Sequence, residues 1–136
     1  MFIFKQKIKI MVETFKKLVG RLSFPLTTKN IGLGLNLFVF LVLGLGGINK
    51  IFGSPEMVDN FTFMNLLPYI EFIGIIEVVS VILLLIPRTS LYGAVLVGSI
   101  MSAAVALHLS LMGGDNITGP LMLGSFAWVG YFLRNR

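Results

Sequence analysis

The chain has 136 residues, of which 56% are apolar and only 12% are charged, whereas about a quarter of the residues in a soluble domain are charged. A soluble fold of this size exposes much of its surface, and six acids and eleven bases are too few to cover it. The absence of cysteine excludes disulfide chemistry and cysteine-held zinc or iron–sulfur centres. The net charge of +5 does not indicate nucleic acid, because the bases cluster beside apolar segments. Composition therefore predicts a membrane protein.

The first segment in chain order, within residues 1–29, is a basic amphipathic helix with a linker. Its apolar residues recur at helical spacing: Phe4, Ile8, Met11, Val12, Phe15, Leu18, Val19 and Leu22. Its charged residues fall on the other side: Lys5, Lys9, Glu13, Lys16 and Lys17. This pattern predicts a helix that lies on the inner membrane surface, where anionic lipid would reinforce its binding. A docking arm for a larger membrane complex is the alternative.

Four apolar segments follow, at residues 31–48, 66–86, 91–112 and 117–133. Each is close to the roughly 17–25 residues that a membrane-spanning helix needs. Ser54 before Pro55 predicts a further short interfacial helix between the first two, over residues 55–65. Small residues four apart in the third segment predict close helix packing: Ala94, Gly98, Ser102 and Ala106. We therefore expect an all-α fold in which residues 30–136 form a four-helix transmembrane bundle.

The basic residues predict the orientation of this bundle. Ten of the eleven lie before the first segment, between the second and third, or after the fourth. Only Lys50 lies on the other side, together with Glu56, Asp59 and Asp115. Because Lys and Arg collect on the cytoplasmic side, both termini are expected in the cytoplasm and the lipid bilayer is the first partner.

Ionisable residues inside these segments are the candidate site, because such side chains are costly in lipid and normally face the protein interior. Helical rise places Lys50, Glu71 and His108 at one depth in the outer half of the membrane, with Glu77 deeper, near the midplane. A structural reading pairs Lys50 with Glu71 or Glu77 and has His108 donate to a carboxylate. A functional reading makes the cluster a ligand pocket or a proton path, because glutamate and histidine can exchange protons.

A metal site at His108 with Glu71 or Glu77 is a weak alternative, since one histidine and two acids make a poor ligand set. The sequence indicates no catalytic residue and no particular cofactor, although a quinone or a lipid would suit an intramembrane pocket.

With these residues placed, the chain resembles the DoxX-like family of small four-helix membrane proteins. The resemblance rests on the glycine-rich run from Gly44 to Lys50, on Gly74 to Glu77 before an apolar run, on residues 103–109 with His108, and on Gly119-Pro120. It covers about residues 30–133, and the basic N-terminal helix is an addition to it. Lys50, Glu77 and His108 are the positions that match the family pattern.

The resemblance implies membrane function without naming a reaction. Some members are linked to membrane oxidoreductases, including a thiosulfate:quinone oxidoreductase, and distant eukaryotic relatives act as assembly chaperones. The first expectation is an accessory or structural subunit of a redox or energy-transducing membrane complex, with other membrane subunits as partners. The second is a quinone- or lipid-binding oxidoreductase component that uses the Glu/His cluster. The third is a small transporter or proton path.

Overall fold

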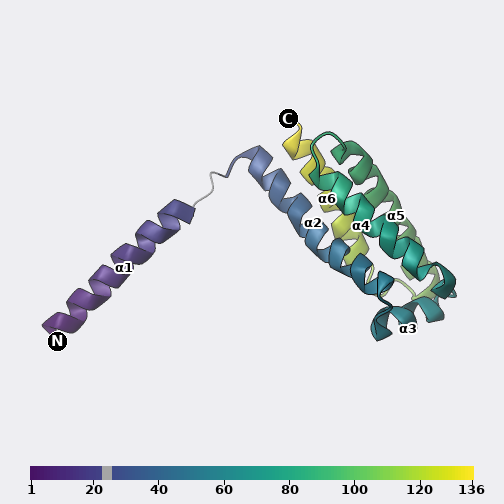
Figure 1. Cartoon of the computed structure of the whole chain (residues 1–136), viewed down its shortest axis with the longest axis horizontal. Coiled ribbons are helices and arrows are strands. Elements are labelled where there is room, and N and C mark those ends of the chain that lie inside the picture. The colour runs from purple at the N-terminus through teal and green to yellow at the C-terminus, as the bar shows by residue number, and fades with distance from the viewer. Residues whose placement is uncertain (23–25) are drawn as a thin grey trace.

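The structure is a computed structural model that describes residues 1–22 and 26–136, apart from the side chain of Leu22, which the sequence placed on the apolar face of the first helix. Every regular element in these two ranges is helical, as expected. The elements are α1 (Phe2–Leu22), α2 (Thr28–Ile51), α3 (Pro55–Phe63), a short 3-10 helix η1 (Leu67–Tyr69), α4 (Ile70–Leu85), α5 (Ser90–Leu111) and α6 (Thr118–Arg134). Figure 1 shows α2, α4, α5 and α6 packed side by side, with α3 at the end of the bundle away from the C-terminus.

Local sequence signals account for several helix ends. The hydroxyl of Thr27 accepts a hydrogen bond from the backbone N–H of Asn30 at 3.3 Å and so caps α2. Helix α3 begins at Pro55, as the sequence predicts, and proline suits the first helical turn because its missing N–H needs no partner there. Gly53 and Asn65, which flank α3, have φ values of 65° and 57°. These left-handed residues turn the chain into and out of this short helix.

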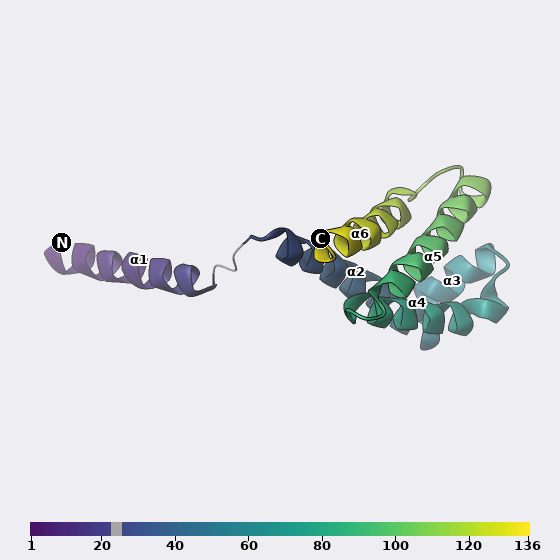
Figure 2. The same cartoon turned by 90° about the horizontal axis from the view of Figure 1, so that it is seen from above.

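The long helices form a closed ring in which sequential neighbours are antiparallel. Helix α2 packs against α4 and α6, and α5 packs against the other sides of the same two helices. Figure 2, the view from above, shows α5 and α6 running alongside each other over α4 and α2. The ring brings the start of α2, the end of α4, the start of α5 and the end of α6 to one end of the bundle.

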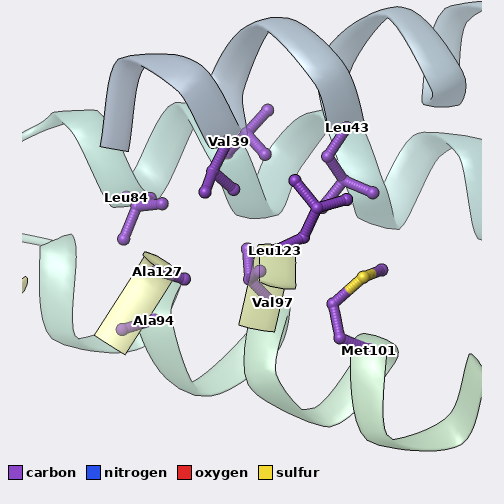
Figure 3. Close-up of a cluster of buried hydrophobic side chains, with 9 residues drawn as sticks. Val39, Leu43, Leu84, Ala94, Val97, Met101, Leu123 and Ala127 are labelled. Carbon is purple, nitrogen blue, oxygen red and sulfur yellow. The ribbon is translucent and has the colours of Figure 1, made fainter. Parts of the chain in front are cut away.

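The buried core of this ring is small, and its outer surface is apolar. The core side chains come from all four long helices (Figure 3): Val39, Leu43, Val81, Leu84, Ala94, Val97, Met101, Leu123 and Ala127. Large apolar side chains instead point outward, among them Phe38, Leu41, Phe72, Val95 and Phe132. A water-soluble bundle would bury such residues, whereas a bundle in lipid has no need to.

Glycines allow the backbones of α2 and α4 to touch. A Cβ atom placed on Gly74 would lie 2.6 Å from the carbonyl oxygen of Gly47, and one placed on Gly47 would lie 2.8 Å from the carbonyl oxygen of Gly74. No larger residue fits at either position without moving the helices apart. The contact lies one turn before Lys50 on α2 and one turn before Glu77 on α4.

The predicted small-residue ridge of α5 is used in part. Ala94 is fully buried in the core, and Gly98 lies against the indole ring of Trp128 on α6. Ser102 and Ala106 are exposed on the outside of the bundle. The first half of the ridge therefore packs inside the bundle, and the second half faces its surroundings.

Three helical segments of the described residues are long and apolar enough to cross a membrane. They are α2 (Thr28–Ile51), η1 together with α4 (Leu67–Leu85), and α5 (Ser90–Leu111). Helix α6, with 17 residues, is shorter than these three. Length and composition thus support a multi-pass protein.

The glycine contact predicts the effect of adding one methyl group. Replacing Gly74 by alanine should lower the free energy of unfolding by about 1–3 kcal/mol, because the new Cβ meets backbone that cannot yield locally. Gly34→Ala is the matched control, since nothing lies within 4 Å of a Cβ at that position. Denaturant unfolding in detergent micelles, followed by circular dichroism, measures both. Equal stability of the two variants would contradict the close α2–α4 contact.

Candidate functional site

A cavity of about 560 Å³ lies inside the half of the bundle that carries α3. All four long helices and α3 contribute to its wall, which is mainly apolar. The polar residues on the wall are Lys50, Asn60, Glu77, His108 and Asn116. Its volume falls within the roughly 300–1,000 Å³ of typical small-molecule sites, and a few polar groups in an apolar wall are also typical of them.

The strongest polar feature of the cavity is an ion pair between α2 and α4. The Nζ of Lys50 lies 2.7 Å from Oε2 of Glu77 and donates a hydrogen bond to it. The side chains are only 12% and 5% exposed, respectively. A charge in such a place is tolerated when its counter-charge lies next to it. The pair leaves the cavity wall with no net charge from these two residues.

The contact between Gly47 and Gly74 makes this pair possible. Because the two backbones touch one turn away, Lys50 reaches across a short gap to Glu77. Lys50 also lies in the last turn of α2, where the helix dipole favours a positive charge.

Helix α3 lies against the ion pair through Phe61. The ring of Phe61, which is 6% exposed, has its centroid 5.9 Å from Lys50 Nζ, a cation–π distance. Met57 and Asn60 of the same helix, and Met64 directly after it, also line the cavity. Flexible methionine side chains adapt to ligands of irregular shape, and Met101 in α5 and Met112 directly after it add two more to the wall.

His108 lies on the α5 side of the cavity. Its Nδ1 is 2.7 Å from the carbonyl oxygen of Ala104, one turn earlier on the same helix. A carbonyl oxygen only accepts hydrogen bonds, so Nδ1 must carry the proton. In the neutral ring, Nε2 is then left as the acceptor. His108 therefore bonds to this backbone carbonyl, where the sequence suggested a carboxylate.

The structure brings together three of the four predicted site residues. Lys50, Glu77 and His108 line one cavity, whereas Glu71 is exposed and does not line it. Six residues separate the two glutamates, which turns them about 240° apart on the helix. Depth alone had grouped Lys50 with Glu71 and left Glu77 apart, but the long lysine side chain reaches back to the deeper carboxylate.

Sequence reasoning missed a second polar cluster, at the opposite end of the bundle. The guanidinium of Arg134 donates to Asn36 Oδ1 at 3.0 Å and to the carbonyl oxygens of Leu84 and Leu85, each at 2.8 Å. Asn36, which is fully buried, donates in turn to the carbonyl oxygen of Ala127 at 3.2 Å. Leu84 and Leu85 end α4, where carbonyls lack helical partners. The available signals were an asparagine inside the first apolar segment and an arginine directly after the fourth, but nothing in the sequence paired them.

The described residues hold no group of three histidine, aspartate or glutamate side chains placed to bind a metal ion. The chemistry of the cavity is therefore that of a paired lysine and glutamate, one histidine and two asparagine amides. Such groups can orient a ligand and exchange hydrogen bonds or protons with it.

The ion pair predicts a specific pattern of stability. Lys50→Met leaves Glu77 buried without its counter-charge and should lower the free energy of unfolding by about 3 kcal/mol. Adding Glu77→Gln to that variant should restore most of the loss, because the remaining side chains are uncharged. Glu71→Gln, an exposed carboxylate on the same helix, is the control and should change stability by less than about 0.5 kcal/mol. Additive losses in the double variant would show that the two residues do not interact.

Comparison with known proteins gives a family match over most of the chain. The family model of the DoxX-like family matches residues 34–130, a span that contains Lys50, Glu77 and His108. No curated protein and no solved structure matches the chain. With the three long apolar helices, this match makes the chain a multi-pass integral membrane protein, and the chain belongs to the DoxX-like family.

Proposed function

We propose that this protein binds an uncharged lipophilic molecule with a polar head group, such as a quinone or a neutral lipid, in the cavity beneath α3. The observation that carries the proposal is an apolar cavity of about 560 Å³ whose wall holds a closed Lys50–Glu77 ion pair. The apolar wall suits a hydrocarbon body, and the polar residues suit a head group that makes hydrogen bonds.

The ion pair also favours an uncharged head group. An anionic ligand would have to draw Lys50 away from Glu77, and a cationic one would have to draw Glu77 away from Lys50. Either exchange leaves a buried charge without its partner, which is costly. A carbonyl or hydroxyl oxygen can instead accept a hydrogen bond from Lys50 while the pair remains closed, because an ammonium group has three donors. The Nε2 atom of His108 can accept a bond from a ligand hydroxyl.

The roles of accessory subunit in a redox or energy-transducing complex and of transporter or proton path stay predictions from the sequence. An oxidoreductase role would need an electron source outside this chain. Ligand binding in the cavity is compatible with each of these roles and is the step that the geometry supports.

Four spans with both termini in the cytoplasm are the topology we propose for this site. Helix α6 presents Leu121, Met122, Val129 and Phe132 outward, like the three longer helices, and its 17 residues match the short end of the spanning range of roughly 17–25. Lys29, Arg88 and Arg136 lie at the end of the bundle opposite α3, the side that the distribution of positive charge assigns to the cytoplasm. The cavity then lies in the outer half of the membrane.

Binding of a probe tests the ligand proposal. The melting temperature of the purified full chain should rise saturably with decyl-benzoquinone, because a ligand that binds only the folded state stabilises it. Myristate, an anionic molecule with a similar chain, should have little effect. Ala104→Phe, on the cavity wall, should abolish the rise, whereas Ala106→Phe, which is exposed on the same helix outside the cavity, should preserve it. A rise that is equal in both variants, or larger with myristate, would contradict the proposal.

Cysteine labelling tests the topology, and because the chain has no cysteine of its own, each variant purified after labelling carries a single reactive thiol. In intact cells, a membrane-impermeant maleimide should label Asp115→Cys, in the loop before α6, and should leave Asn135→Cys unlabelled until the membrane is opened. Labelling of both positions from outside would place the two ends of α6 on the same side and would exclude the fourth span.

A further inference from the structure

Helix α1 carries a charge that the rest of the chain lacks. It holds six basic residues, Lys5, Lys7, Lys9, Lys16, Lys17 and Arg21, against the single acid Glu13. The remaining residues of the chain hold five bases and five acids. The whole net charge of +5 therefore lies on this one helix, outside the bundle.

The charge is confined to part of the helix circumference. At 100° per residue, an arc of about 120° contains only apolar side chains, and those that the structure describes are all exposed: Phe4, Ile8, Met11, Val12, Phe15, Leu18 and Val19. The six bases are distributed over the remaining circumference, with Lys5, Lys9 and Lys16 next to one another. A helix of this kind presents an apolar face and a cationic face at the same time.

We propose that α1 is a binding site for anionic phospholipid on the cytoplasmic surface of the bilayer, with its apolar arc inserted between acyl chains and its lysines on the phosphate groups. The binding of anionic lipid is argued from charge complementarity, because basic helices are attracted to anionic leaflets. The insertion between acyl chains is argued from the exposed apolar arc, because this surface is buried only in a hydrocarbon environment. Nucleic acid would satisfy the lysines but not the apolar arc.

The covalent connection to the bundle places α1 within reach of that surface. Residues 23–27 join the end of α1 to the start of α2, and five residues extend over at most roughly 18 Å. The start of α2 lies at the end of the bundle that holds Lys29, Arg88 and Arg136, which the proposed topology sets at the cytoplasmic face. This inference does not depend on ligand binding in the cavity, and its test is separate from the quinone titration.

Spin labels on the full chain can report where α1 lies. One variant carries the label at Phe15→Cys in the apolar arc, and a second carries it at Gln6→Cys on the polar side. Each is reconstituted in vesicles of equal parts phosphatidylcholine and phosphatidylglycerol, or of phosphatidylcholine alone. Collision of the label with oxygen reports hydrocarbon, and collision with a water-soluble nickel chelate reports water.

In the anionic vesicles, the label at position 15 should favour oxygen and the label at position 6 should favour nickel. Phosphatidylcholine alone, or Lys9→Glu added to the position-15 variant, should lower the inserted fraction on the order of tenfold, because each base near the surface contributes to binding. Arg136→Glu makes the same charge change at the cytoplasmic end but outside α1, and it should leave the inserted fraction unchanged.

Two results would overturn the proposal. Equal insertion in both kinds of vesicle would show that anionic lipid is not recognised. A label at position 15 that is shielded from oxygen and nickel alike would show that the apolar arc packs against protein, as a docking arm would.

Discussion

An ion pair between two helices inside an apolar bundle is the interaction on which the rest of this structure depends. Lys50 and Glu77 meet at 2.7 Å one turn away from the point where Gly47 and Gly74 let the backbones of α2 and α4 touch. Once the pair is formed, neither helix can rotate or slide without exposing a charge to lipid, and an unpaired charge in that environment is costly. The pair therefore specifies how α2 and α4 align, and it places a paired positive and negative charge on the wall of the neighbouring cavity.

The two ends of the bundle are built differently. At the end of α6, Arg134 donates hydrogen bonds to Asn36 and to the last carbonyls of α4, which ties these three helices together. At the other end, a cavity lies beneath α3, and Lys50, Glu77 and His108 are among the polar residues of its wall. One end of the bundle is thus closed by hydrogen bonds, and the other is hollow and covered by a short helix between two turns.

Much of this arrangement could be predicted from the sequence because lipid imposes simple rules on composition. The apolar stretches gave the long helices to within a few residues, and Ser54-Pro55 gave the start of α3. The family assignment followed from Gly44 to Lys50 and from Glu77, and the family match confirms it. These features are local in sequence, so periodicity and spacing are enough to find them.

Contacts between distant residues were harder to predict. Depth calculated from helical rise takes no account of side-chain length, so it grouped Lys50 with Glu71 and left both Glu71 and Glu77 as possible partners of Lys50. Arg134 and Asn36 are 98 residues apart, and their meeting depends on the pairing of α2 with α6, which no local pattern contains. The cavity itself is lined by residues of four long helices and α3 together, and composition alone cannot distinguish such a space from close packing.

A density map of the full protein, purified with its native lipids and enlarged by a bound antibody fragment, tests the central claim most directly. The account predicts continuous density for the Lys50–Glu77 pair and additional density, belonging to a bound molecule, in the space between that pair, His108 and α3. A map in which Glu77 points away from Lys50, or in which side chains of α3 and α5 fill the cavity, would contradict it.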